Sequence, residues 1–135
     1  HAAPINLAWG RDNRTTGIRV PLSPPEARRI ENRMAGMDCN PYLALAAQLA
    51  AGLDGIERKL PLEPEHSGDM YQADGVREIP KTLRDAADAF HGSAMLRAAF
   101  GDEVIDHYHR AALWEISEQD RVVTDWDVKR GFERA

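Results

Sequence analysis

The spacing of the hydrophobic residues changes at Asn40 and Pro41, and this change limits the possible fold more than any other feature. Before it, apolar and polar side chains alternate, which is typical of strands. After it, Asn40 can cap a helix and Pro41 suits the first helical turn. Apolar residues then recur at every third or fourth position: Tyr42, Leu45, Leu49, Leu53 and Ile56. The pattern predicts an α+β fold with strands first and helices after.

Two or three antiparallel strands are expected within residues 4–9, 15–20 and 28–34, separated by turn-rich and proline-rich breaks. The proline, glutamate and glycine residues of the segment 60–75 predict a long loop. Further helices are expected at 82–91, 93–100, 102–117 and 125–133, the last one capped by Thr124. So few strands cannot cover their own edges. We therefore expect the end of a larger domain rather than a whole protein.

Length and composition exclude several classes of protein. The 135 residues fit one domain, and no apolar run approaches the roughly 20 residues that a membrane helix needs, so no membrane partner is expected. The net charge of -5 argues against general nucleic-acid binding. Residues 1–9 lack the pattern of a signal peptide, and the one cysteine, Cys39, is compatible with a reducing compartment. A cytoplasmic location is expected.

Arginine is concentrated in residues 11–33, which hold six arginines against three acidic residues although the whole chain is acidic. The guanidinium group is planar and always charged, and it matches phosphate and carboxylate oxygens. The segment therefore indicates either recognition of an anion or a set of surface ion pairs.

Arg29, Glu31 and Arg33 are spaced two residues apart, so on a strand they project from one face. A carboxylate between two guanidinium groups stays ionised. It can bind a divalent cation while the arginines hold the accompanying anion. The alternative is an internal ladder of ion pairs.

Four motifs together resemble the glutamine synthetase family. They are Asn-Arg-x-x-x-Ile-Arg-x-Pro at 13–21, Arg-Arg-Ile-Glu-x-Arg at 28–33, Asn-Pro-Tyr-Leu-Ala at 40–44 and Ala-Gly-Leu-Asp-Gly-Ile at 51–56. The resemblance extends over essentially the whole chain. It implies that residues 1–135 are the C-terminal portion of the family's catalytic domain, roughly the last third of a much longer enzyme.

The resemblance also implies roles for five residues. Arg14 and Arg19 match arginines that contact nucleotide phosphates and stabilise phosphoryl transfer, and Arg29 matches another arginine on the nucleotide side. Glu31 matches a carboxylate that binds a catalytic divalent metal. Arg33 matches the arginine that holds the glutamate substrate. Arg14 and Arg19 are five residues apart and would face oppositely on a regular strand, unless Gly17 hosts a bulge.

The implied activity is ATP-dependent amide formation with Mg or Mn. ATP phosphorylates the γ-carboxylate of glutamate, and an amine (ammonia or a polyamine) then displaces the phosphate. The family forms large homo-oligomers, and a fragment is expected to be inactive alone. A non-catalytic interaction or structural module remains the alternative.

Three positions bear on the branch of the family. An ammonia-using enzyme carries a glutamate where this chain has Ala2, which favours the branch that ligates larger amines, such as γ-glutamylpolyamine (γ-glutamylputrescine) synthetases. Glu26 replaces a lysine that faces the nucleotide in many members. Tyr71 lies where some bacterial members are adenylylated, but an ordinary loop tyrosine is favoured here.

The histidines give no metal signature in the sequence. His107 and His109 are two residues apart, so they do not share a helix face. His66 and His91 have no ligand partner at helpful spacing. No histidine is therefore expected in the site.

Overall fold

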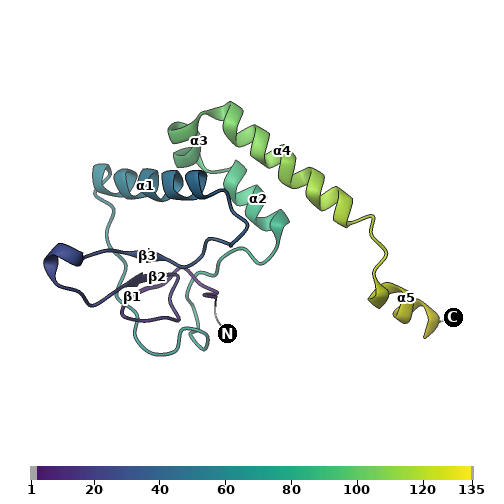
Figure 1. The fold of residues 1–135 in the computed structure, drawn as a ribbon, viewed down its shortest axis with the longest axis horizontal. Helices are drawn as coiled ribbons and strands as arrows, with labels where there is room; N and C mark the ends of the chain where they lie inside the picture. The colour runs from purple at the N-terminus through teal and green to yellow at the C-terminus, as the bar shows by residue number, and fades with distance from the viewer. Residues whose placement is uncertain (1–2, 135) are drawn as a thin grey trace. The chain divides into compact units, whose positions relative to one another are not determined.

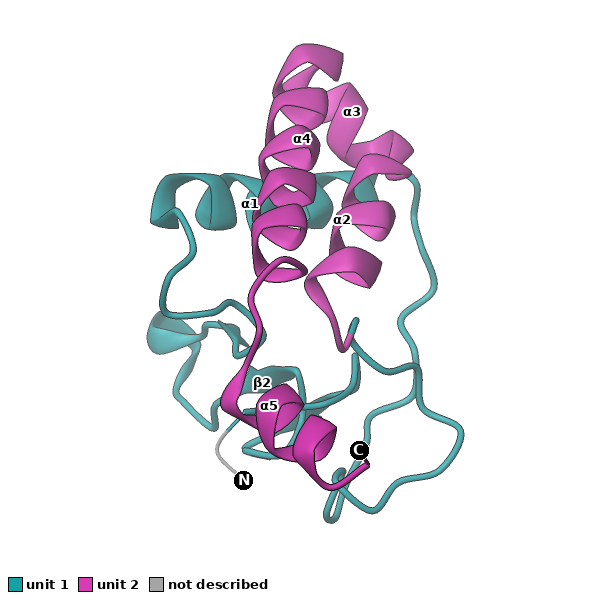
Figure 2. Cartoon of the chain, turned by 90° about the vertical axis from the view of Figure 1, so that its right-hand side faces the viewer, with its two compact units in different colours: residues 1–80 teal, residues 81–135 magenta. Residues whose placement is uncertain are grey.

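The computed structural model describes residues 3–134, and the chain divides into two compact units, residues 1–80 and 81–135 (Figure 2). Three strands come first and helices follow, which confirms the predicted α+β fold (Figure 1).

The first unit contains a sheet with the order β1 (Trp9–Arg11), β2 (Ile18–Val20) and β3 (Glu31–Asn32). β2 and β3 are antiparallel, as predicted. The expectation that all strands are antiparallel is wrong for β1 and β2, which run parallel with Trp9 opposite Ile18. The cause is the compact loop of residues 12–17, which returns the chain to the start of β1 before β2 begins.

Two local features produce this return. Asp12 adopts a left-handed backbone conformation with φ 50°, which aspartate tolerates better than most residues. The fully buried hydroxyl of Thr16 lies 2.8 Å from the Asn13 carbonyl oxygen and 2.9 Å from that of Ile18. A short polar loop thus replaces the longer crossover that usually joins parallel strands.

The predicted long loop is confirmed, and it covers the outer edge of β1 and the residues before it. The backbone N–H of His66 donates to the Trp9 carbonyl at 3.0 Å, and the indole of Trp9 donates to the Glu63 carbonyl at 2.7 Å. Further along, the N–H of Leu7 donates to the Arg77 carbonyl at 2.8 Å. The edge that the sequence left uncovered is therefore paired within the first unit.

The first unit also contains a short 3-10 helix, η1 (Pro25–Ala27), and the helix α1 (Pro41–Glu57). The Asn40 side chain accepts hydrogen bonds from the N–H groups of Tyr42 and Leu43, and Pro41 occupies the first turn, as predicted. The apolar stripe of α1 is solvent-exposed, with Tyr42 at 85% and Leu53 at 51%. The core of this unit lies instead around the sheet, where Ala8 and Met70 are buried.

The second unit contains four helices, α2 (Leu83–His91), α3 (Ala94–Phe100), α4 (Asp102–Gln119) and α5 (Asp125–Phe132). Hydroxyl side chains cap three of them: Thr82, Ser93 and Thr124. The cap at Thr124 was predicted from the sequence. Helices α2 and α3 pack on α4, with Ala87, Ile105 and Ile116 buried. Within the described residues, no helix combines the length and apolarity required to cross a membrane.

Candidate functional site

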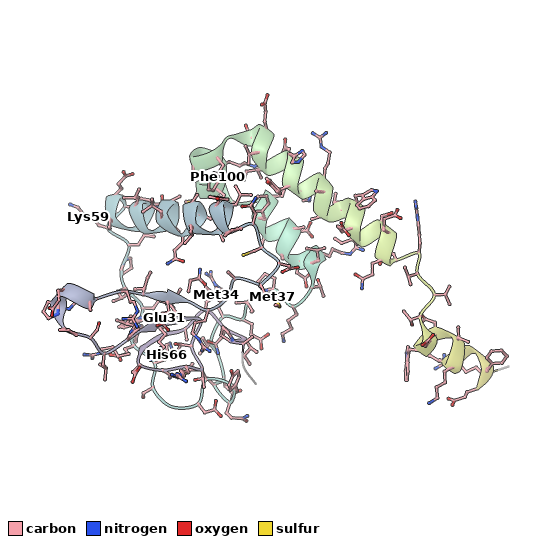
Figure 3. The ribbon with its side chains drawn as sticks, viewed as in Figure 1. Glu31, Met34, Met37, Lys59, His66 and Phe100 are labelled. Carbon is pink, nitrogen blue, oxygen red and sulfur yellow. The ribbon has the colours of Figure 1, made fainter. Side chains whose placement is uncertain are left out.

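A guanidinium group and a carboxylate face each other across β2 and β3. The antiparallel register places Arg19 opposite Glu31, and Arg19 Nη1 lies 2.8 Å from Glu31 Oε2. Arg29 Nη2 lies 3.5 Å from the other oxygen, Glu31 Oε1. Glu31 is found among the side chains around the sheet in Figure 3. Its side chain is 32% exposed, so the carboxylate remains reachable from solvent.

Positive charge dominates the surroundings of Glu31. The hydrogen bond from Arg19 lowers the pKa of the Glu31 carboxyl, partial burial opposes this, and the charges of Arg19, Arg29 and Arg33 lower it further. The expected grouping of Arg29, Glu31 and Arg33 is therefore present. Arg33 also continues the ladder, because its N–H donates to the Gly17 carbonyl at 2.9 Å.

Arg14 lies in the loop between β1 and β2 rather than on a strand. The alternation that would make Arg14 and Arg19 face oppositely therefore does not apply, and no bulge at Gly17 is needed. Gly17 serves close packing instead, because a Cβ there would lie 2.5 Å from the Asn6 carbonyl oxygen. The Arg14 side chain is exposed, and no described residue forms an ion pair or hydrogen bond with it.

Arg14 borders an open hollow of about 480 Å³, which it shares with Arg11, Asn13, Glu65 and His66 among others. Arg11 forms a bidentate pair with Glu65, with its Nη2 2.7 Å from Oε2. The Asn13 amide donates to the Gly68 carbonyl at 2.9 Å. These contacts fix the backbone of the loop. The guanidinium group of Arg14 is therefore exposed on a loop whose position is fixed.

Sequence reasoning missed Asp12, which forms a second ion pair with Arg19. Its carboxylate and that of Glu31 together raise the pKa of the Arg19 guanidinium, and the hydrogen bond to Asp12 is the largest single cause. No spacing rule could find this pair, because it depends on the parallel register of β1 and β2.

Sequence reasoning also missed a histidine pair in the second unit. The rings of His91 and His109 stack with centroids 4.1 Å apart. His91 Nε2 lies 3.3 Å from Asp106 Oδ1, which also accepts from Arg97 at 2.9 Å. His91 has no partner at a short spacing in the sequence, as expected. In the structure its partners come from α4, which lies further along the chain.

The remaining sequence predictions fall on three positions. Ala2 lies outside the described residues. Glu26 is exposed in η1, and Tyr71 is half-buried in a turn, where its N–H donates to the Asp69 carboxylate at 3.0 Å.

The residues present fit a divalent cation only in part. Glu31 offers one hard oxygen ligand, Oε1, which Arg29 contacts at 3.5 Å while Arg19 bonds to Oε2. Across residues 3–134, no three histidine, cysteine, aspartate or glutamate side chains gather closely enough to hold a metal ion. A metal bound at Glu31 would need ligands beyond those that the described chain supplies.

Comparison with known proteins identifies the family. The model of the glutamine synthetase catalytic domain matches residues 1–131. The chain belongs to the glutamine synthetase family. The first unit contains the family motifs at residues 13–21, 28–33, 40–44 and 51–56. Its strand register pairs Arg19 with Glu31, and Arg29 contacts the same carboxylate.

The most similar relatives include ligases that join glutamate to amines. The chain is 48% identical to gamma-glutamylethanolamide synthetase GlnA4 of Streptomyces coelicolor, over 98% of this chain and 28% of the relative. It is 39% identical to a glutamate–isopropylamine ligase of a Pseudomonas species, over 93% of this chain and 28% of the relative. The chain thus spans less than a third of the length of these relatives.

A solved structure described as a GmaS/ADP complex shares the fold. It superimposes with a TM-score of 0.80 and 29% identity, covering 97% of this chain and 30% of that one. The same arrangement of strands and helices therefore exists within a much longer protein.

Proposed function

We propose that this chain is part of an ATP-dependent ligase that joins glutamate to an amine larger than ammonia. The observation that carries the proposal is the cluster of Glu31 with Arg19, Arg29 and Arg33, in a chain 48% identical to a glutamate–ethanolamine ligase. Ala2 supports the larger amine, since alanine cannot act as the base that ammonium requires. The chain corresponds to the C-terminal part of the catalytic domain.

Arginine and glutamate side chains supply complementary chemistry in this proposal. Arg14 is exposed on a held loop and binds nucleotide phosphate, and Arg29 binds on the same side. Arg19 stabilises charge that develops on the transferred phosphoryl group. Arg33 binds the substrate glutamate close to its γ-carboxylate. Phosphorylation of that carboxylate makes it reactive towards the amine.

Glu31 would hold one Mg or Mn ion. Its carboxylate is ionised by its arginine neighbours and is reachable from solvent. When bound, the ion would neutralise negative charge on the nucleotide phosphates. The arginines around Glu31 would bind the phosphate oxygens of the nucleotide.

The first experiment measures binding to the 135-residue chain. Calorimetric titration with Mn-ATP is expected to show heat of binding. Arg14→Ala should weaken the affinity for Mn-ATP about tenfold, since a charged hydrogen bond contributes about 1.5–3 kcal/mol. Arg28→Ala is the matched control, because Arg28 is also an exposed arginine of the first unit. Equal loss of affinity in both variants, or no heat with the parent chain, would contradict the nucleotide role and favour a non-catalytic module.

A second experiment concerns the reaction. We expect the 135-residue chain to form no amide from glutamate, ATP and ethanolamine, because Glu31 is one metal ligand of a larger set. Amide formation by this chain alone, detected by mass spectrometry, would overturn that expectation.

A further inference from the structure

Three charged side chains form a row across the three strands. Asp12 follows β1, Arg19 lies in β2 and Glu31 begins β3. Arg19 donates from Nη1 to Glu31 and from Nη2 to the Asp12 Oδ1 oxygen. The Arg19 side chain is 16% exposed, whereas the Asp12 side chain is 48% exposed. One arginine is thus shared between two carboxylates.

The strand register explains why Asp12 reaches Arg19. Arg19 lies opposite Gly10 in the register of β1 and β2. Asp12 is two residues further on, and its left-handed backbone turns at the end of the strand. Its N–H donates to the Val20 carbonyl at 2.9 Å, which fixes Asp12 beside the residue that follows Arg19.

Because the Arg19 guanidinium bonds to two carboxylates, its contact with Glu31 is limited. A guanidinium group commonly pairs with a single carboxylate through two parallel hydrogen bonds, which occupies both carboxylate oxygens. Here Asp12 takes one side of the fork, so Arg19 contacts only Oε2 of Glu31. Oε1 makes a longer contact of 3.5 Å with Arg29 Nη2. Glu31 therefore keeps one oxygen that Arg19 does not occupy.

We propose that Asp12 is a positioning residue, which holds Arg19 in place and prevents it from occupying both oxygens of Glu31. The proposal rests on the proposed function in one respect, the binding of a divalent cation at Glu31. The clamp on Arg19 is independent of that function. Asp12 does not contact the cation in this proposal and acts only through Arg19.

The first test measures the guanidinium of Arg19 directly. Nitrogen NMR reports the rate of rotation about the Nε–Cζ bond, and Arg19→Lys assigns the signal. We expect rotation to become about tenfold faster in Asp12→Gly, because one charged hydrogen bond is lost. Glycine adopts a positive φ without strain, and Asp12→Asn provides a second variant that keeps the side-chain shape. An unchanged rate in both variants would overturn the proposal.

The second test measures Mn²⁺ affinity by electron paramagnetic resonance. The dissociation constant is expected to rise about tenfold in Asp12→Gly, since Arg19 then competes for both oxygens of Glu31. Glu65→Gln is the matched control, because it removes one negative charge and releases Arg11 instead. An equal effect in the control, or none in Asp12→Gly, would overturn the claim that Asp12 keeps Glu31 available.

The two failures are distinguishable. If the parent chain binds no Mn²⁺ while rotation still accelerates in the Asp12 variants, the cation site of the proposed function is wrong and the clamp on Arg19 stands. If the parent binds Mn²⁺ and rotation is unchanged, the clamp is wrong and the cation site stands.

Discussion

Replacement of Thr16 by valine tests whether a single buried hydroxyl holds the loop that carries Arg14. The hydroxyl is fully buried and lies within 2.9 Å of two carbonyl oxygens, those of Asn13 and Ile18. It has one proton, so it donates one hydrogen bond at a time. Valine preserves the shape but leaves a partly buried carbonyl without this donor.

The magnitude follows from these contacts. Loss of the Thr16 hydrogen bond, which leaves the carbonyl oxygen without a donor, destabilises the first unit by about 2 kcal/mol. With a urea dependence of about 1 kcal/mol per M for a unit of this size, the unfolding midpoint falls by about 2 M.

Tryptophan fluorescence can report the first unit alone. Trp9 belongs to this unit, whereas Trp114 and Trp126 lie in the second unit and are 60% and 68% exposed. Replacement of both by phenylalanine leaves Trp9 as the reporter and changes stability little, since both positions are exposed.

The matched control is Thr82→Val, which removes a hydroxyl cap from α2 in the second unit. It is expected to leave the Trp9 transition unchanged. If Thr16→Val also leaves the midpoint of that transition unchanged, the hydroxyl does not hold the loop and the reasoning is refuted.

Three further predictions concern the packing and the charges of the two units. Arg97 lowers the pKa of the Asp106 carboxyl, so this interaction stabilises the second unit fully above the unfolded pKa of about 3.9 and is lost as the pH falls through the lower folded value. Thermal unfolding of Asp106→Asn should therefore depend less on pH below about 4 than unfolding of the parent, and equal slopes would contradict this. Ile105→Ala should destabilise the second unit by about 3 kcal/mol, because Ile105 has 0% exposure; a loss below about 1 kcal/mol in urea unfolding would argue against close packing there. Gly17→Ala should destabilise the first unit by about 1–3 kcal/mol, since the new Cβ meets the Asn6 carbonyl oxygen at 2.5 Å, and an unchanged urea midpoint would refute this.

The helices could be predicted because their signals are local. Asn40 precedes Pro41, and hydroxyl residues precede each of α2, α3 and α5, so the caps fix where those helices begin. The order of strands before helices followed from the change in hydrophobic spacing. The spacing did not reveal that the apolar face of α1 is exposed, since periodicity shows which side is apolar and not what covers it.

The site was predictable where its residues lie within a few positions of one another in the sequence. Arg29, Glu31 and Arg33 follow the period of two, so their proximity needs only a local extended backbone. The roles assigned to all five residues remain predictions, because binding has to be measured: Arg14, Arg19, Arg29, Glu31 and Arg33.

The sequence by itself determined the family motifs, the class of fold, the approximate positions of the helices and the arginine-flanked carboxylate. Only the tertiary structure decided that β1 runs parallel to β2, that Asp12 shares Arg19 with Glu31, and that His91 stacks on His109. The first group depends on neighbours within a few residues along the chain. The second depends on how separate segments pair, and local propensity carries no information about that pairing.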